Sequence, residues 1–304
     1  MNTANDAVRP LPTTIPEYLA QLRQALSGAD PAMIQDALYD AEEYLRSELA
    51  EQPGKSEAEV IAGVAGSYGA PEEVADIYRE TEVTVSRALR PPVPPKRRSW
   101  LGRFFGVAAD PRTYGALFYL LLTIVIGTFY FSWVVTGASL SLSLLILIIG
   151  VPLLVLFLGS VRVLSLVEGR MVEVLLGVRM PRRPTYLEQD QGWLARIGAM
   201  FRDGRTWTTM LYFLMMLPLG IAYSVVFTVL LGISLGFMLC PLALVFDQAF
   251  DLHVGVWSVA ANAPWASPVL CMIGVVMLFT TLHLARGIGH LHGLMAKHLL
   301  VRLD

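Results

Sequence analysis

The sequence predicts an all-α protein in which a small cytoplasmic helical domain precedes a four-helix transmembrane bundle built from two parallel repeats. The composition is 55% hydrophobic and 16% charged over 304 residues, whereas soluble proteins are about 25% charged. The apolar residues gather in long uncharged stretches after residue 112, and most acidic residues precede residue 90. This distribution disfavours a soluble enzyme and a nucleic-acid-binding protein with one long basic face.

The charges differ in sign between the two parts of the chain. Residues 1–90 contain 16 of the 25 acidic residues and 7 of the 23 basic residues, which gives a net charge of −9. The rest of the chain carries a net charge of +7, so the total of −2 describes neither part. We expect residues 1–14 to be a flexible tail that lacks the apolar segment of a signal peptide, and residues 15–90 to form the cytoplasmic domain.

Residues 15–90 carry the start signals of several helices. Apolar residues recur at helical spacing over 16–26 and again up to Glu51. Asp30 precedes Pro31, the arrangement of an N-cap followed by a proline at the first helical position. Ser56 and Glu59 form the capping box of a third helix.

The end of this domain predicts a fourth helix. We expect the third helix to end at Gly69 and the next to begin at Pro71, with Val74, Ile77 and Tyr78 facing inward. The second helix also leaves an acidic stripe, formed by Asp36, Asp40, Glu43 and Glu51. Such a stripe is either a solvated face or a docking site for a basic partner.

Residues 91–98 form a proline-rich basic linker. The stretch Pro91-Pro92-Val93-Pro94-Pro95 favours a stiff polyproline II spacer. Lys96, Arg97 and Arg98 follow it and are suited to an anionic membrane surface. A stiff spacer can pass a change in the membrane helices to the acidic domain.

Two long apolar stretches predict four membrane crossings. Residues 113–161 contain no charged residue, and 206–285 contain only Asp247 and Asp251. At about 20 residues per crossing, and with small residues at 136–139 as a turn, the expected spans are 114–136, 139–161, 208–232 and 267–285. The segment 233–266 is too polar in its second half for an ordinary crossing, and whether 233–250 is re-entrant or interfacial stays open.

Basic residues predict the orientation. Lys and Arg are concentrated in 91–112, in 162–205 and after residue 285, and the two remaining loops have none. Because cytoplasmic loops retain basic residues, we expect both termini to be cytoplasmic.

The membrane half contains an internal repeat. At an offset of 93, residues 99–130 align with 192–223, and the identities include Trp100/Trp193, Arg103/Arg196, Asp110/Asp203, Tyr119/Tyr212, Gly127/Gly220 and Tyr130/Tyr223. An even number of crossings in each unit predicts parallel repeats, over 99–191 and 192–304. We expect the aspartates to cap the helices they precede, the glycines to allow close helix approach, and Tyr119 and Tyr212 to be packed with satisfied hydroxyls.

A second offset relates the later parts of the two repeats. At an offset of 124, Arg162 aligns with Arg286, Glu168 with His292 and Glu173 with Lys297. The two cytoplasmic helices are therefore expected to pair by opposite charge, Glu168 with His292 and Glu173 with Lys297. The two offsets, 124 and 93, differ by 31 residues, so the second repeat contains about 31 additional residues. We assign them to an extracytoplasmic insertion at 233–266.

The sequence lacks the motifs of known catalytic sites. It has no Walker loop, no Gly-x-Ser-x-Gly elbow, no His-Glu-x-x-His and no paired cysteines. Cys240 and Cys271 lie in apolar runs, so no disulfide, metal site or cofactor is expected. The residues most similar to a metal cluster are four histidines near the end of the chain: His283, His290, His292 and His298. We interpret them as interfacial residues. The bundle interior is expected to hold almost no polar residues and no clustered acids or histidines.

The insertion contains the residues that we consider for ligand sensing. They are ionisable or aromatic and lie where the repeat symmetry is broken: Asp247, Asp251, His253, Trp257 and Trp265. Ionisable residues near a membrane suggest function. The alternative is a surface loop whose tryptophans mark the interface.

Two family resemblances cover nearly all of residues 15–303. The pattern YLAQLRQALSGADPAMIQDALYDAEEYLRSEL, followed by SEAEVIAGVAGSYGAPEEVADIYRE, resembles HAAS, a helical signalling domain found beside PadR-type transcription regulators in bacteria. The segments RTYGALFYLLL, RTWTTMLYFLMMLPLGIAY, GVPLL and LLGVRMP resemble the bacterial "putative sensor" family, a four-span unit often fused to histidine kinases. The chain departs from the kinase-fused arrangement, because no ATP-binding segment follows its last crossing.

The resemblances imply a non-enzymatic sensor and signal transducer of the bacterial inner membrane. We expect an envelope or lipid cue to reach a cytoplasmic, PadR-like regulator through the linker, without direct contact with nucleic acid. A homodimer stays open. The alternative function is a small membrane transporter or an accessory subunit of a transport complex.

Overall fold

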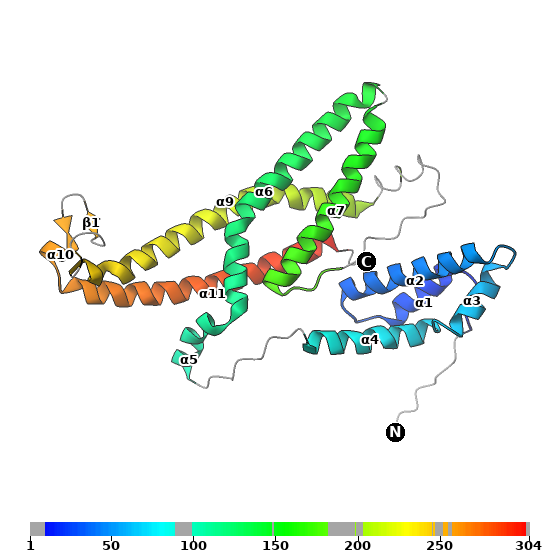
Figure 1. Cartoon of the computed structure of the whole chain (residues 1–304), viewed down its shortest axis with the longest axis horizontal. Helices are drawn as coiled ribbons and strands as arrows, with labels where there is room; N and C mark the ends of the chain where they lie inside the picture. The colour runs from blue at the N-terminus through cyan, green and yellow to red at the C-terminus, as the bar shows by residue number, and fades with distance from the viewer. Residues whose placement is uncertain are drawn as a thin grey trace. The chain divides into compact units, whose positions relative to one another are not determined.

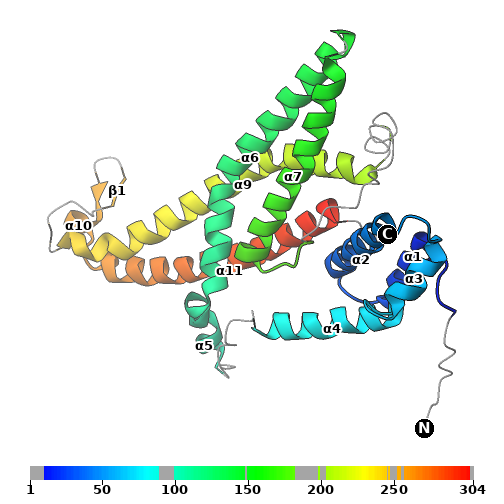
Figure 2. The same ribbon diagram turned by 45° about the vertical axis from the view of Figure 1, so that its right-hand side comes forward.

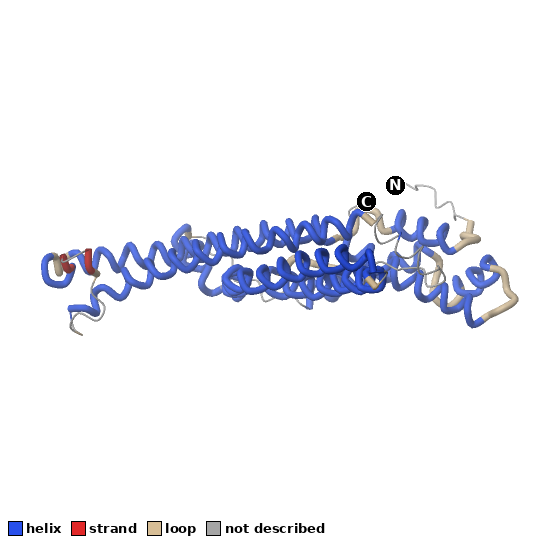
Figure 3. The backbone as a smooth tube through the Cα atoms, turned by 90° about the horizontal axis from the view of Figure 1, so that it is seen from above, coloured by secondary structure: helices blue, strands red, loops and turns tan. Residues whose placement is uncertain are grey.

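The computed structural model of the chain describes residues 10–88, 99–147, 149–181, 198, 203–244, 246, 252–254 and 257–301. It divides into two compact units (Figure 1). The first comprises residues 1–93, 181–199 and 301–304, and the second comprises 94–180 and 200–300. Both are helical, and among the described residues the strands form only one short pair (Figure 3), so the predicted all-α class is confirmed.

The N-terminal unit contains four helices: α1 (Ile15–Ala25), α2 (Pro31–Glu51), α3 (Glu57–Ala65) and α4 (Pro71–Ala88). The predicted caps are confirmed. Asp30 Oδ1 accepts a hydrogen bond from the Ala32 amide at 2.9 Å. The Ser56 amide donates to the Glu59 carboxylate at 2.8 Å, while the Glu59 amide donates back to Ser56 Oγ at 3.4 Å. Each bond satisfies an amide that the helix itself leaves unpaired.

Two expectations for this unit are wrong. The third helix ends at Ala65, because the chain must turn before Gly69, whose φ of +112° lies in the left-handed region. Ile77 is 57% exposed, and the inward face of α4 is formed by Val74 and Ala75. At 100° per residue, Val74, Ala75 and Tyr78 share one side of the helix and Ile77 lies at its edge.

The four helices enclose a small core of their own. Tyr18, Leu22 and Leu45 are fully buried in it. The Tyr18 hydroxyl donates to the Gly69 carbonyl at 2.8 Å, which ties α1 to the turn before α4. Burial, aided by the neighbouring Tyr68, raises the pKa of Tyr18 above its ordinary value.

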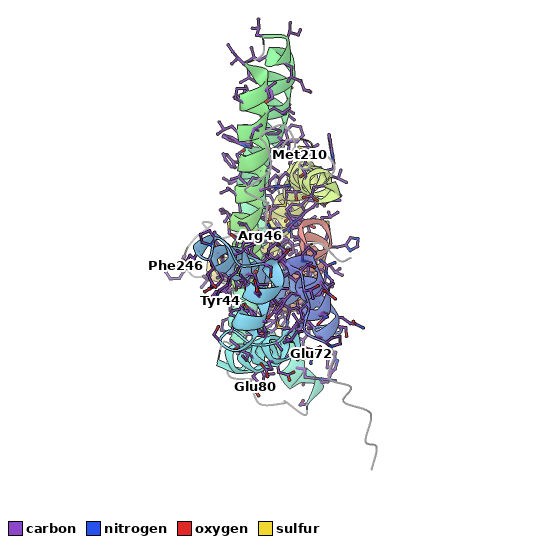
Figure 4. All side chains as sticks on the ribbon, turned by 90° about the vertical axis from the view of Figure 1, so that its right-hand side faces the viewer. Tyr44, Arg46, Glu72, Glu80, Met210 and Phe246 are labelled. Carbon is purple, nitrogen blue, oxygen red and sulfur yellow. The ribbon has the colours of Figure 1, made fainter. Side chains whose placement is uncertain are left out.

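The membrane half is built on four long helices: α6 (Pro111–Leu144), α7 (Gly150–Leu176), α9 (Gly204–Leu239) and α11 (Ala266–Leu300). All four are long and apolar enough to cross a membrane. In Figure 4 the side chains that project from the α6–α7 hairpin are mostly carbon, and exposed residues such as Val125 and Leu156 agree. A helix of 34 residues is about 51 Å long at 1.5 Å per residue, against about 30 Å of hydrocarbon. Each helix is therefore long enough to span a bilayer with its ends beyond the hydrocarbon or with some tilt.

The four helices form two hairpins, α6–α7 and α9–α11, that cross each other (Figures 1 and 2). At the crossing of α6 and α9, a Cβ on Gly127 would lie 2.6 Å from the Met216 carbonyl carbon. A Cβ on Gly220 would lie 2.6 Å from the Thr123 carbonyl oxygen. Gly127 matches Gly220, and Thr123 matches Met216, at the repeat offset of 93. The repeats therefore meet symmetrically, and the predicted close approach at both glycines is confirmed.

The expected hairpin turn at 136–139 is wrong. Helix α6 continues through these residues to Leu144, and a 3-10 turn, η2 (Leu145–Leu147), leads to α7. The small residues serve packing, because a Cβ on Gly137 would collide with the Phe157 ring. The turn itself needs Gly150, which lies directly against the Leu144 and Leu145 backbone.

The extra chain of the second repeat begins later than expected. Residues 233–239 belong to α9, and η3 (Cys240–Leu244) follows. Beyond it lie β1 (His253–Val254), β2 (Trp257–Ser258) and the short α10 (Val259–Asn262). The strands are antiparallel, with His253 opposite Ser258.

A short helical segment precedes α6. It consists of α5 (Trp100–Phe105) and the 3-10 turn η1 (Gly106–Ala109). The predicted linker at 91–98 lies outside the described residues.

Candidate functional site

Two ionisable side chains lie inside the membrane bundle. Glu168 on α7 is 0% exposed and His292 on α11 is 2% exposed. They occupy equivalent positions of the two repeats, at the offset of 124. An unpaired ionisable group in such a place is strongly destabilising, so their hydrogen-bond partners decide what the site can do.

The hydroxyls of Tyr119 and Tyr212 join these two residues. Both donate to Glu168 Oε1, and the Tyr212 bond is 2.8 Å long. The same hydroxyls lie 3.0 and 3.1 Å from His292 Nε2. Tyr119 and Tyr212 are themselves fully buried, so the predicted satisfied hydroxyls are confirmed.

A second pair of tyrosines completes the arrangement. The Tyr130 hydroxyl donates to Glu168 Oε2 at 3.2 Å. The Tyr223 hydroxyl lies 3.4 Å from His292 Nδ1. Tyr130 and Tyr223 are equivalent at the offset of 93, so each repeat contributes two tyrosines and one ionisable group. We call these six residues, Tyr119, Tyr130, Glu168, Tyr212, Tyr223 and His292, the polar cluster.

With His292 neutral, the hydrogen bonds of the polar cluster fix the position of its ring proton. Because Tyr119 and Tyr212 donate to Glu168, their oxygens can accept only from His292, which places its ring proton on Nε2. His292 Nδ1 is then an acceptor, and Tyr223 donates to it. Every polar group in the cluster is satisfied, with Glu168 accepting three hydrogen bonds. The six residues come from all four long helices, and the hydrogen bonds among them link these helices.

Two ion pairs obey the same symmetry as the cluster. Asp110 Oδ2 lies 3.0 Å from Arg286, and Asp203 Oδ2 lies 3.0 Å from Arg162. Each aspartate also caps its helix, accepting from the Arg112 or Arg205 amide at 3.1 Å, as predicted. Each pair ties the first helix of one repeat to the second helix of the other, so the hairpins are cross-linked in both directions.

The structure brings Glu168 and His292 into one cluster, with tyrosine hydroxyls between them. Glu173 is paired with Arg170, three residues earlier on α7, and Lys297 lies in the last turn of α11. The pairing of Glu173 with Lys297 stays a prediction. The expectation of an almost apolar interior without clustered acids or histidines is wrong. The two repeat offsets relate Tyr119 to Tyr212, Tyr130 to Tyr223 and Glu168 to His292, but they do not show that these residues meet.

The residues considered for ligand sensing are only partly described. Asp247 and Asp251 lie outside the described residues. His253 is exposed in β1, Trp257 belongs to β2, and Trp265 is 76% exposed. A sensing role for this segment stays a prediction.

The acidic stripe is smaller than expected. Asp36 is only 6% exposed, because it shares the buried side of α2 with Met33 and Ala37. Asp40 accepts a hydrogen bond from the Tyr78 hydroxyl at 2.8 Å, and burial with this bond raises the pKa of Tyr78. Glu43 and Glu51 are exposed.

The remaining histidines of the sequence analysis do not gather around His292. His283, His290 and His298 are exposed on α11. Within the part of the chain that the structure describes, no group of three His, Cys, Asp or Glu side chains could hold a metal ion.

Comparisons with known proteins agree with both resemblances. Residues 119–300 match the family model described as "Putative sensor", and residues 17–77 match the model of HAAS. The first match contains the whole polar cluster. No curated protein and no solved structure matches the chain.

Proposed function

Because this chain belongs to the "Putative sensor" family and joins that membrane domain to a HAAS domain, we propose that it is a non-enzymatic sensor of the bacterial inner membrane. It passes an envelope or lipid cue to a cytoplasmic transcription regulator of the PadR type.

The observation that carries this proposal is the polar cluster. A fully satisfied hydrogen-bond network in an apolar interior cannot shift gradually, because a small displacement leaves several buried groups unpaired at once. A movement of one hairpin against the other therefore switches between discrete packings. A cue that favours one packing changes all four helices together, and α6 begins shortly after the linker that leads to the HAAS domain.

The HAAS domain offers a surface for the recipient. Glu43 and Glu51 are exposed on α2, and residues 1–90 carry a net charge of −9. Acidic surfaces select basic partners and accelerate their association. We propose that the regulator docks here and that its affinity differs between the two packings of the bundle.

The test uses the full chain in nanodiscs and the PadR-like regulators of the same genome, each purified. We expect one regulator to bind, and Glu43→Lys to weaken it several-fold. Glu80→Lys makes the same charge change on α4 and serves as the matched control. Binding by none of the regulators, or equal weakening by both variants, would contradict the proposal.

The topology has a separate test. We propose from the distribution of basic residues that both termini are cytoplasmic, so a reporter that is active only outside the cytoplasm should be silent when fused after Asp304. An active reporter would show the opposite orientation, in which the HAAS domain could not reach a cytoplasmic regulator.

The polar cluster also favours a second candidate function, transport. Ionisable residues inside a bundle are common in proton and ion pathways, and Glu168 and His292 are of this kind. Proteoliposomes with a pH-sensitive dye inside would decide between the two. Proton flux that Glu168→Gln abolishes would favour the transporter, and the sensor predicts no flux in either protein.

A further inference from the structure

An open groove lies between α5 and α11, away from the polar cluster. It has a volume of about 340 Å³ and is lined by Trp100, Arg103, Phe104, Thr280 and His283. Its walls are largely aromatic, and Arg103 supplies a permanent positive charge. Arg103 is exposed, and no ion pair joins it to any residue that the structure describes.

Helix α5 is held against α11 by specific contacts. His283 Nε2 lies 3.0 Å from the Phe104 carbonyl oxygen and donates to it, because a carbonyl can only accept. The two rings stack, with centroids 5.5 Å apart. Phe105 packs edge-on against Phe279, with centroids 4.7 Å apart. The groove is thus a built feature, although α5 has only six residues.

The contacts also place the groove at the end of the apolar spans. Arg286, three residues after His283, pairs with Asp110, which caps the start of α6. Trp100 is 71% exposed and Leu101 is 57% exposed. Exposed tryptophan beside a cation, at the end of a membrane helix, is typical of the level of lipid headgroups.

We propose that this groove binds an anionic phospholipid. The Arg103 guanidinium contacts the phosphate, and the Trp100 and Phe104 rings pack against the glycerol and the upper acyl chains. Charge complementarity selects this occupant, since the groove has a cation and no acidic side chain among its lining residues. The site does not depend on the proposed signalling role, because binding is a property of the chain alone.

Native mass spectrometry of the full chain in detergent tests the site. The probes are phosphatidylglycerol and phosphatidylcholine with identical acyl chains. One basic residue near a membrane surface contributes about 1 kcal/mol, so we expect phosphatidylglycerol to bind at least about fivefold more tightly. Equal retention of the two lipids would overturn the proposal. Glycerol phosphate at the concentration of the lipid should not displace it, and displacement would assign the groove to a free anion instead.

Two variants locate the binding in the groove. Arg103→Gln should weaken phosphatidylglycerol about fivefold, whereas the matched control Arg170→Gln, on α7, should not change it. Thr280→Trp fills the groove from an exposed position and leaves every charge in place, so it should also weaken binding. A loss with Arg103→Gln but none with Thr280→Trp would indicate diffuse surface attraction and would refute the site, as would an effect of neither variant.

Discussion

The hydroxyls of Tyr119 and Tyr212 lie 3.4 Å apart at the centre of the membrane bundle, where equivalent positions of the two repeats meet. Each hydroxyl contacts Glu168 of the first repeat and His292 of the second. Near a symmetry axis, two identical side chains face each other and contact both halves at once. The ionisable groups break the symmetry, because the same position is an acid in one repeat and a histidine in the other.

Removal of one bridging hydroxyl should destabilise the bundle. Tyr119→Phe or Tyr212→Phe takes a donor from the buried Glu168, at a cost of about 1 to 3 kcal/mol, and thermal unfolding of the full chain in detergent measures it. The double variant should differ from the sum of the singles, because the residues share partners. Tyr114→Phe is the matched control, since the Tyr114 hydroxyl bonds the Ala108 carbonyl at an exposed site. An equal loss in the control would contradict the importance of the cluster.

Close helix approach should make Gly127 intolerant of any side chain. In Gly127→Ala the new Cβ would lie 2.6 Å from the Met216 carbonyl carbon, and such overpacking costs about 1 to 3 kcal/mol. Gly232→Ala, in the same pair of helices, meets no atom within 4 Å and should be neutral or stabilising, because alanine favours helix over glycine. Thermal unfolding of both variants compares them. Equal stability would mean that the two hairpins separate at Gly127 more easily than the packing indicates.

The sequence predicted the helices, their caps and the repeat because each depends on local or periodic patterns. Asp110, Asp203 and Ser56 act within their own helix turn, and the match of Gly127 to Gly220 follows from one offset. The hairpin turn was misplaced because small residues such as Gly137 serve turns and helix packing equally well. Gly137 serves packing because it lies against Phe157 of the other helix, a contact that the sequence did not reveal.

The polar cluster was missed for a different reason. Tyr119, Tyr212, Glu168 and His292 come from four helices, and only the crossing of the hairpins brings them together. The repeat offsets related Glu168 to His292 and suggested that they pair by charge. They gave no indication that tyrosine hydroxyls would lie between the two. The burial of Asp36 was not predictable from the sequence, because at 100° per residue it lies opposite Leu45 and the predicted apolar face of α2.

Acid should loosen helix α3. The Ser56 amide and hydroxyl hold the pKa of the Glu59 carboxyl below its ordinary value of 4.5. A carboxyl with a lowered pKa in the folded state stabilises that state above its ordinary pKa, and the contribution is lost as the pH falls through the lowered value. The hydrogen-exchange rate of the α3 amides, corrected for intrinsic rates, should therefore rise as the pH is lowered from about 5. Glu59→Gln should remove most of this dependence and Glu80→Gln should leave it, whereas the same profile in all three proteins would exclude the capping box as its source.

Exchange of the two ionisable groups should be tolerated better than the loss of either. Glu168→His alone places two histidines among the four tyrosines, and His292→Glu alone places two carboxyls there. The first leaves several hydroxyls without their acceptor, and the second brings two acids together. Removal of one partner from a buried polar pair costs about 3 kcal/mol or more. The double variant restores one acid and one histidine within a frame that the repeat makes nearly symmetric, so its melting temperature in detergent should lie above that of both single variants. If the melting temperature of the double variant did not exceed those of both single variants, Glu168 and His292 would act independently. The tyrosines would then not couple the two hairpins.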